Sequence, residues 1–532
     1  MLTPANPSRI RSRSGHGFEL RGLETAPRSS VEQGRFGRMF RWLPPASFTE
    51  DALLALSKTM IQQEFAARRK SGEALDTPLT EFEPEDENPT ITAGFTYLGQ
   101  FIDHDITFDP VSSLERLNDP DALHDFRTPR LDLDSLYGMG PGLAPYLYED
   151  DGIHLLSGEQ KSHDAVDRFD LPRNSANIRR ALIGDKRNDE NLIVSQLHSA
   201  FIGFHNKVAD RFAAGIPDGQ KLEEIQRMVR WHYQWLALHQ FLPTIVGEDM
   251  AKEVLGTGAT PNLRFYRPKS EAYMPVEFAV ACYRFGHSMI RPSYSLNMTV
   301  RQATGASENF NRIPVFSADD QAENPLANLN GFRELPSFWT VDWSFFFSGL
   351  PIPASASGLA LPQPSYRIDT VLADPLTSLP EFSKDPNADR RMLAFRNLLR
   401  GWRLQLPSGQ KVAHHLGVPV IPDTVLFEDR QSFDGQNRSA VLKEHQIFRG
   451  QAPLWYYILK EAELTKRKGH EDEEGGHHLG KVGGRIVAEV LVGLVWNDKN
   501  SYLRQQPDWK PDLGSTAGDF TIQDLFKVAG LL

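Results

Sequence analysis

Cysteine is almost absent from this sequence, whose 532 residues include only Cys282. A disulfide within the chain is therefore excluded, and so is a metal cage built from several thiolates. Basic charge is also in the minority, because 58 lysine and arginine residues face 69 aspartate and glutamate residues and leave a net charge of −11. That balance argues against a nucleic-acid partner.

Long apolar segments are missing as well. The run Ile486–Trp496 contains Glu489 and is shorter than the roughly 20 residues that cross a bilayer, so no transmembrane segment is expected. The N-terminal segment lacks the apolar stretch of a secretory signal. The default expectation is a cytoplasmic protein, with export by an unconventional route left open and the oligomeric state undetermined.

Apolar residues make up 40% of the chain and charged residues 24%, which is the balance of an ordinary globular protein. Helical periodicity recurs while strand-like alternation is scarce, so the sequence predicts a mainly α fold with long irregular loops and little β structure. We expect an extended arm over 1–50 and a single domain over 51–532. The predicted helices are 49–69, 92–104, 191–213, 219–246, 275–289, 387–403, 453–464, 480–497 and 520–531. The predicted loops are 81–87, 108–146, 300–385 and 465–476.

The most informative motif is the stretch Thr96–Asp105. On a helix, Gln100 and His104 share a face, and Asp103 and Asp105 flank the histidine. Two carboxylates beside an imidazole are costly to bury without cations or covalent bonds. A solvated polar helix end is the simpler interpretation, but the aromatic and apolar neighbours argue against it.

Oxygen-bearing side chains gather in the stretch 128–138. Thr128, Asp132 and Asp134, with a main-chain carbonyl, are the ligands that a hard cation such as Ca²⁺ prefers, and Asp105 would add a further carboxylate. An ordinary aspartate-rich turn is the alternative. An EF-hand is not expected, because its twelve-residue pattern is absent.

Arg187 and Glu190 lie in the stretch Gly184–Asn191, directly before a predicted helix. From that position both side chains can project inward. His198 and His205 share a face of the helix. We expect them to pack, or to support other residues of a site, rather than to bind a metal, because neither has a partner three or four positions away.

His287 lies in an apolar stretch beside Gly286, and a glycine there leaves room for a flat group to approach the backbone. A lone histidine of this kind is also commonly a satisfied core residue. Asn397 is a candidate partner, because its amide oxygen can accept the Nδ1 proton of a buried histidine.

Taken in this order, the five motifs resemble those of the animal-type (myeloperoxidase-like) haem peroxidase superfamily, in its bacterial branch. The resemblance spans roughly residues 90–500. It implies a mainly α-helical fold that binds haem b between a distal and a proximal helix and holds Ca²⁺ near the distal one. The implied activity is reduction of hydrogen peroxide through Compound I, with oxidation of halides, thiocyanate or phenolic and other aromatic donors, and a place in the response to oxidative stress.

Carried over residue by residue, the resemblance assigns roles on both sides of the haem. His104 corresponds to the distal histidine, Gln100 to the glutamine beside it and Arg187 to the distal arginine. His287 corresponds to the proximal iron ligand and Asn397 to its hydrogen-bond partner. The other assigned groups are Arg284 and Arg400 near the haem propionates, Asp103 and Glu190 as carboxylates that form esters with the haem, and Asp105, Thr128, Arg130 (through its carbonyl), Asp132 and Asp134 as calcium ligands.

One departure from the family concerns the bonds to the haem. Members with a sulfonium link carry methionine directly after the ester glutamate, where this chain has Asn191, so that link cannot form. We expect a less strongly oxidising haem that prefers iodide, bromide, thiocyanate or phenols to chloride. Ester bonds at Asp103 and Glu190 need not be complete, because they form autocatalytically with peroxide.

Two other functions stay open. A fatty-acid dioxygenase of the cyclooxygenase-like branch needs a radical tyrosine three residues before the proximal histidine. This chain has Arg284 there, and Tyr283 lies on a different face. A non-catalytic adhesion or matrix protein that kept the fold would not need the intact set of Gln100, His104, Arg187 and His287.

Overall fold

The computed structural model describes most of the chain from residue 34 onward. Parts of five predicted elements lie outside the described residues, as does 1–33 of the predicted arm: the helix predicted over 49–69 and the loops predicted over 81–87, 108–146, 300–385 and 465–476. The described residues are 34–61, 86–108, 117–118, 123–163, 166–177, 179–258, 260–269, 271–299, 312–316, 328–356, 359–379, 382, 385, 387–429, 438–466 and 475–532.

Helices carry the fold, as the periodicity predicts. The longest described helices are α5 (Leu192–Phe212) and α16 (Lys481–Asn497). Asn191 begins α5, because its side chain accepts hydrogen bonds from the main-chain N–H groups of Ile193 and Val194. The other helices are α1 (Glu50–Lys58), α3 (Ala93–Ile106), α4 (Asp134–Tyr137), α6 (Lys221–Leu236), α7 (Leu242–Val246), α8 (Glu248–Leu255), α9 (Val276–Val280), α11 (Leu393–Arg403), α12 (Gly409–Leu416), α13 (Asp423–Leu426), α14 (Arg438–Glu444), α15 (Leu454–Leu464), α17 (Tyr502–Gln505) and α18 (Ile522–Val528).

Strands are short and form small sheets, of which the pair β2-β9 packs against α3. One sheet has the order β3-β1-β6, with β1 antiparallel to β3 and parallel to β6; the pairs β2-β9, β4-β5 and β7-β8 are antiparallel. The strands are β1 (Gly34–Gly37), β2 (Glu87–Thr92), β3 (His124–Asp125), β4 (Gln160–His163), β5 (Val166–Phe169), β6 (Met274–Pro275), β7 (Ser293–Tyr294), β8 (Ile313–Pro314) and β9 (Pro364–Tyr366).

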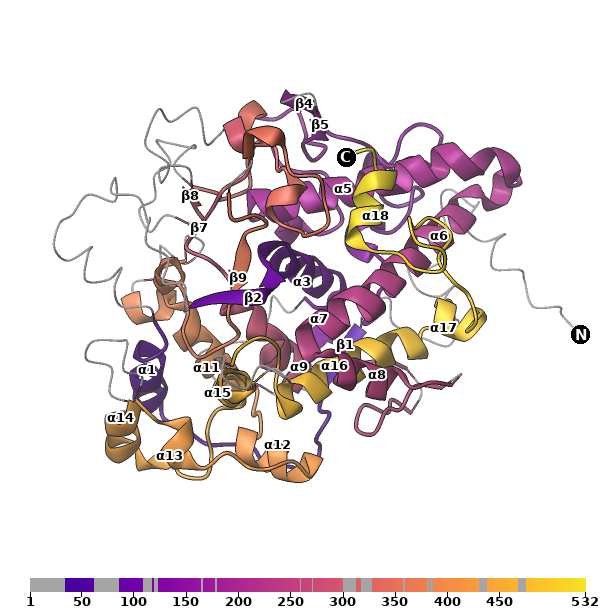
Figure 1. Ribbon diagram of the computed structural model, residues 1–532. Helices are drawn as coiled ribbons and strands as arrows, with labels where there is room; N and C mark the ends of the chain where they lie inside the picture. The colour runs from indigo at the N-terminus through magenta and orange to yellow at the C-terminus, as the bar shows by residue number, and fades with distance from the viewer. Residues whose placement is uncertain are drawn as a thin grey trace, which may run out of the picture.

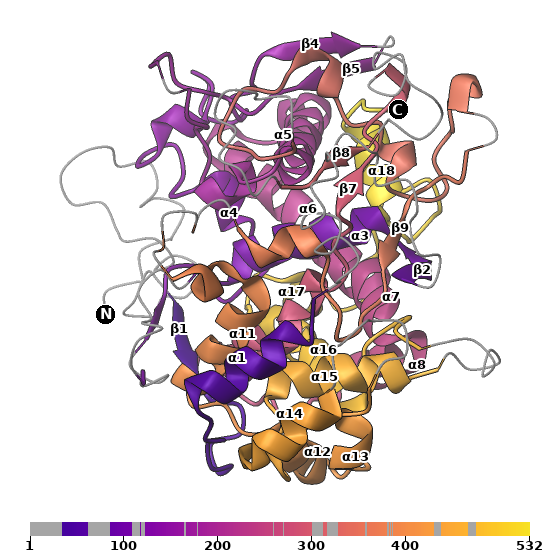
Figure 2. The same cartoon turned by 90° about the vertical axis from the view of Figure 1, so that its left-hand side faces the viewer.

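Helix α3 lies at the centre of the molecule. In both views α5 lies at one end, α12 to α14 lie at the other, and α3 lies between them (Figures 1 and 2). Of its 14 residues, only Gln100 and Asp103 keep appreciable exposure. Gly99 lets the ring of Phe241 approach, since a Cβ there would lie 3.2 Å from that ring. Polar groups on so buried a helix need partners inside the protein.

The segment before α1 packs into the body of the protein. Phe36, Phe40 and Phe48 belong to the same hydrophobic core as the helices. The buried carboxylate of Glu277 accepts hydrogen bonds of 2.9 and 3.1 Å from the main-chain N–H groups of Met39 and Phe40. Part of the stretch predicted as an arm is therefore bound to the start of α9.

Two predicted helices are wrong in extent. The stretch 275–289 is not one helix, because α9 ends at Val280 and a tighter 3₁₀ turn, Cys282–His287, follows. Ala281 between them adopts φ −127° and ψ −70°, outside the helical region. The helix predicted over 49–69 ends at Lys58, where the main-chain N–H of Thr59 bonds back to Leu56 and Ser57. The described residues contain no helix long and apolar enough to cross a membrane.

His205 joins three parts of the structure around α5. Its Nδ1 lies 3.0 Å from the hydroxyl of Tyr137 on α4, and its Nε2 lies 2.8 Å from the carbonyl oxygen of Ile153. The ring is fully buried, and this burial lowers the pKa of His205 to about 4. The pKa of His205 in the folded protein thus lies below its value of about 6.5 in the unfolded chain. The contribution of this neutral ring to the free energy of unfolding is therefore fully present above about pH 6.5 and is lost as the pH falls toward 4.

We expect the free energy of unfolding to fall by up to about 3 kcal/mol between pH 6.5 and pH 4 because of this one ring. The measurement is denaturant unfolding of the wild type and of His205→Gln, which cannot titrate, at both pH values. The difference between the two proteins isolates His205. An equal loss in both would contradict the assignment.

Candidate functional site

The face of α3 that carries Gln100 and His104 meets the loop between 184 and 191. The carboxylate of Glu190 accepts a hydrogen bond from Nε2 of Gln100, and its Oε1 lies 3.6 Å from Nε2 of His104. The amide oxygen of Gln100 accepts a 3.1 Å hydrogen bond from Nδ2 of Asn191. The structure thus brings together three of the predicted site residues, Gln100, His104 and Glu190.

Nδ1 of His104 points the other way, into the protein. It lies 2.8 Å from Oδ1 of Asn188. An amide oxygen only accepts, so this contact places the imidazole proton on Nδ1 and leaves the lone pair on Nε2, which faces Glu190. Burial and the positive charge of Arg187 lower the pKa of His104 to about 3, so the ring is neutral at ordinary pH.

Arg187 lies beside this face but is heavily bonded. Its guanidinium pairs with Asp185 at 2.8 Å, and its Nη2 also donates to the carbonyl oxygens of His104 at 3.1 Å and Thr107 at 2.6 Å. His104 lies in the last turn of α3 and Thr107 follows the end of the helix, where a cation is favoured. Arg187 therefore ties the loop to the end of α3. Among the described residues, no hydrogen bond uses its Nη1.

The remaining charges around Arg187 are also paired. Asp185 accepts a second, 2.8 Å hydrogen bond from Arg127. Burial alone would raise the pKa of Asp185, but the charges of Arg187 and Arg127 hold it below its usual range. Burial raises the pKa of Asp103, while Arg187 and Arg284 act in the opposite direction. Asp103 therefore lies in the field of two arginines from different parts of the chain.

His287 ends the 3₁₀ turn that follows α9, and this turn packs beside α3. Nδ1 of His287 lies 2.7 Å from Nδ2 of Asn397 on α11, while Oδ1 of Asn397 accepts a 3.0 Å hydrogen bond from Arg284. The predicted pair is present, but the amide nitrogen, not the expected oxygen, faces the ring. Ligation of iron through Nε2 requires the oxygen to face Nδ1, which a half-turn of the amide provides.

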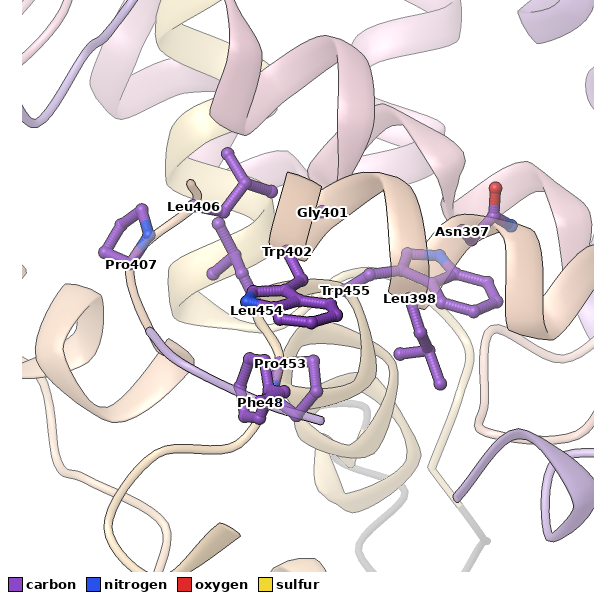
Figure 3. A pocket seen from close by; sticks show the side chains of 10 residues that line it. All are labelled: Phe48, Asn397, Leu398, Gly401, Trp402, Leu406, Pro407, Pro453, Leu454 and Trp455. Atoms are coloured by element: carbon purple, nitrogen blue, oxygen red, sulfur yellow. The ribbon is translucent and has the colours of Figure 1, made fainter. Parts of the chain in front are cut away.

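A tryptophan packs against the ring of His287. The ring of Trp455 meets the imidazole edge to face at 6.4 Å between centroids, and its indole N–H donates to the carbonyl oxygen of Arg284 at 3.1 Å. Figure 3 shows Trp455 and Asn397 on the wall of a small apolar pocket between α11 and the start of α15. Arg400 lies one turn beyond Asn397 on α11 and is half-buried.

These residues fit a flat prosthetic group. Gln100, Asp103, Glu190, Arg284 and His287 are surrounded by protein, yet each keeps accessible surface where a packed core would leave none. A Cβ built on Gly286 would meet no atom within 4 Å, so the backbone beside His287 borders open space. His287 beside this space is the kind of imidazole that can bind a haem iron.

Three carboxylates form a second cluster, beside the end of α3. Ligand oxygens of Asp105, Asp132 and Asp134 lie within 4.8 Å of one another. Burial and the neighbouring Asp132 raise the pKa of Asp105 to about 7, so the cluster is poorly balanced without a cation. The hydroxyl of Thr128 lies 2.9 Å from both oxygens of Asp132.

The loop around this cluster is held in an uncommon backbone conformation. Leu133 has φ +58°, which a leucine rarely adopts, and its N–H donates to Asp105 at 3.1 Å. Gly184 packs against the same loop so closely that a Cβ would lie 2.5 Å from the carbonyl oxygen of Ser135. Arg130, whose carbonyl was predicted as a ligand, lies in this loop with its N–H bonded to the carbonyl of Thr128.

Sequence comparison bears on the loops that carry this site. The model of the animal haem peroxidase family matches residues 113–331, which include the carboxylate loop, the loop with Arg187 and Glu190, and His287. This stretch is therefore similar to the animal haem peroxidase family, over less than half of the chain. Helix α3 precedes the matched segment and Asn397 follows it.

Curated relatives of this chain match over part of their length. A peroxidasin homologue of Caenorhabditis elegans is 28% identical over 204 residues, which are 35% of this chain and 15% of the relative. Human eosinophil peroxidase is 26% identical over 232 residues, which are 43% of this chain and 28% of that protein. The matched part thus spans less than a third of these relatives.

Solved structures match over nearly the whole chain and show the fold. Peroxidase A of Dictyostelium discoideum superimposes with a TM-score of 0.59 at 15% identity, over 96% of this chain and 97% of its own. The fatty acid alpha-dioxygenase of Oryza sativa superimposes with a TM-score of 0.54 at 15% identity, over 94% and 78%. The mainly α peroxidase fold expected from the resemblance is confirmed.

The sequence motifs do not predict the roles that two amides have in the site. Asn188 and Asn191 lie among the charged residues of the 184–191 loop, and their amides orient His104 and Gln100. The signal that was available for Asn191 is its place before an apolar helix, which is typical of an N-cap. Nothing in the sequence pairs Asn188 with a residue 84 positions earlier.

We expect Asn191→Ala to lower the free energy of unfolding by about 1 kcal/mol, because α5 loses its N-cap. Asn191→Asp keeps the capping oxygen and should stay close to the wild type. Denaturant unfolding of the three proteins checks this. Equal loss in both variants would show that the cap is not what Asn191 contributes.

Proposed function

We propose that this chain is a haem-dependent peroxidase that reduces hydrogen peroxide and oxidises small donors such as iodide, bromide, thiocyanate or phenols. The observation that carries the proposal is the placement of His104, whose Nδ1 is bound to Asn188 and whose Nε2 is directed toward Glu190. The similarity of residues 113–331 to the animal haem peroxidase family supports the cofactor and the reaction class.

The proposed cofactor site uses residues from both sides of the open space. His287 would hold the iron, Asn397 would orient His287, and Arg284 and Arg400 would meet the propionates. Asp103 and Glu190 would supply the carboxylates for ester bonds. Haem, when bound, supplies a redox-active iron that accepts the peroxide and takes up its two oxidising equivalents.

His104 would perform the proton transfers. Its neutral Nε2 takes the proton from the near oxygen of peroxide and returns it to the far oxygen, which leaves as water. Gln100 and Glu190 keep that nitrogen in a fixed polar setting. The charge of Arg187 disfavours the imidazolium before peroxide arrives and favours negative charge on the departing oxygen.

The second candidate is a fatty-acid dioxygenase, which the fold likeness to alpha-dioxygenases favours. The position three residues before His287 is Arg284, whose guanidinium is bound to Asn397 and to the carbonyl oxygen of Ala279. Tyr283 is buried against Phe278.

An absorption spectrum before and after one equivalent of peroxide, set beside oxygen uptake with a polyunsaturated fatty acid, separates the two candidates. Oxygen uptake without a response to peroxide would sink the peroxidase proposal.

Removing the proposed base should slow the peroxide reaction selectively. His104→Ala is expected to retain haem but to react with peroxide about 10²–10⁴-fold more slowly, which is the range of a lost general acid–base. His287→Ala is expected to lose the haem or change its Soret band. Stopped-flow mixing measures the first effect and absorption the second.

The matched control is His205→Gln, a buried histidine on α5 that the proposed reaction does not use. It should react at the rate of the wild type. Wild-type rates in His104→Ala, or an unchanged Soret band in His287→Ala, would refute the respective role.

We also propose that the carboxylate cluster binds Ca²⁺ through Asp105, Asp132, Asp134, Thr128 and the carbonyl of Arg130. A hard cation would relieve the repulsion that raises the pKa of Asp105 and would bind the end of α3 to the 128–134 loop. Rigidity at that point helps to keep His104 in place.

Calcium should therefore stabilise the fold by about 2.7 kcal/mol at a hundred times its dissociation constant. Thermal unfolding of chelated protein with and without added Ca²⁺ measures the response. Asp132→Asn should abolish it, while Asp151→Asn, a change in an exposed turn outside the cluster, should keep it. An unchanged melting temperature in the wild type would exclude a structural cation here.

A further inference from the structure

Asn188 lies between two buried imidazoles. Its Oδ1 is 2.8 Å from Nδ1 of His104 on α3, and its Nδ2 is 2.9 Å from Nδ1 of His198 on α5. Asn188 is fully buried, and His198 and His104 are 1% and 5% exposed. None of these three side chains can exchange a partner for bulk water.

The side-chain amide of Asn188 determines which ring nitrogens of the two histidines carry protons. Its oxygen only accepts and its nitrogen only donates, so Nδ1 of His104 carries a proton and Nδ1 of His198 does not. In neutral rings the lone pair of His104 is then on Nε2, and the proton of His198 is on Nε2. A turned amide would exchange these states and leave His104 with a proton on Nε2, where it cannot act as a base.

We propose that Asn188 and His198 are positioning residues that hold His104 in the tautomer required for proton abstraction; this inference rests on the proposed function. His198 holds the amide by accepting from its nitrogen, and the amide oxygen then accepts from Nδ1 of His104. When His104 takes a proton, the same hydrogen bond becomes charge-assisted and stabilises the imidazolium. Proton transfer therefore gains both orientation and stabilisation from one contact.

The surrounding structure keeps the hydrogen-bonded series His198–Asn188–His104, here called the relay, in place. Asn188 lies in a 3₁₀ turn, Lys186–Asp189. The side chain of Asp185 caps the start of this turn by accepting a hydrogen bond from the main-chain N–H of Arg187, and Asp189 at its end pairs with Arg173 at 2.8 Å. The ring of His198 meets Phe101 of α3 at 5.9 Å between centroids. Among the described residues, Nε2 of His198 has no hydrogen-bond partner, so its bond to Asn188 is the one that orients the ring.

The test compares two substitutions of Asn188 in the haem-loaded protein. Asn188→Leu removes both hydrogen bonds at similar volume, and we expect the peroxide reaction to slow by about 10–100-fold, as on losing a partner that orients a functional histidine. Asn188→Asp keeps an oxygen that accepts from Nδ1 of His104. His198 can adapt to it by moving its proton to Nδ1, since its Nε2 has no bond to lose. Asn188→Asp should therefore recover most of the rate.

A second readout does not depend on turnover. Hydrogen cyanide must give up its proton to a distal base when it binds ferric haem, so its association rate reports on His104 directly. That rate should fall in Asn188→Leu by a factor similar to the fall with peroxide and recover in Asn188→Asp. The apparent affinity for the electron donor should stay unchanged, because the donor step does not need the base.

The outcomes separate this inference from the proposed function. Wild-type rates in Asn188→Leu, or equally slow rates in Asn188→Leu and Asn188→Asp, would overturn the relay and leave the peroxidase proposal intact. A wild type that binds haem and cyanide but ignores peroxide would defeat the peroxidase proposal, while the cyanide rates would still decide the relay. If Asn188→Leu fails to fold, His198→Phe takes its place, with an expected slowing that wild-type rates would contradict.

Discussion

The structure depends on one constraint, which is that a buried helix with polar side chains must find all its partners inside the protein. Helix α3 crosses the centre of the molecule, and the loop between 184 and 191 supplies most of those partners. Glu190, Asn191 and Asn188 each bind a side chain of the helix, and Arg187 binds its terminal carbonyls. The loop and the helix therefore form one structural unit, in which the geometry of each depends on its hydrogen bonds to the other.

The buried charges around the loop and α3 are balanced because arginine and aspartate side chains alternate in space. Asp185 lies between Arg127 and Arg187, and Arg127 also reaches Asp134 in the carboxylate loop at 3.2 Å. A cation bound among the carboxylates would thus act through Arg127 and Asp185 on Arg187. Removal of one partner would leave a buried charge uncompensated, which is the costly way to break such a network. The site and the stability of the central helix consequently share the same residues.

The surroundings of His104 and His287 are built differently. On the side of α3 the histidine is held by a loop, a second helix and an amide relay, whereas His287 ends a 3₁₀ turn and rests on Trp455 and Asn397. A side chain that moves protons needs a defined tautomer, and the relay provides one. A ring that binds a metal needs a rigid support and an acceptor at its other nitrogen, and Asn397 can provide that after a half-turn of its amide.

Local pattern in the sequence was sufficient for the helical class, for the position of α3, α5, α15 and α16, and for the motifs that resemble a haem peroxidase. Periodicity reports which face of a segment is buried, and this property belongs to neighbouring residues. The sequence could not reveal the break at Ala281, because the apolar residues continue through it and only packing decides where the helix ends. Nor could it pair Asn188 with His104, or direct Arg187 to the carbonyls of α3. Those contacts join residues more than 80 positions apart, and their distances exist only once the helices have packed.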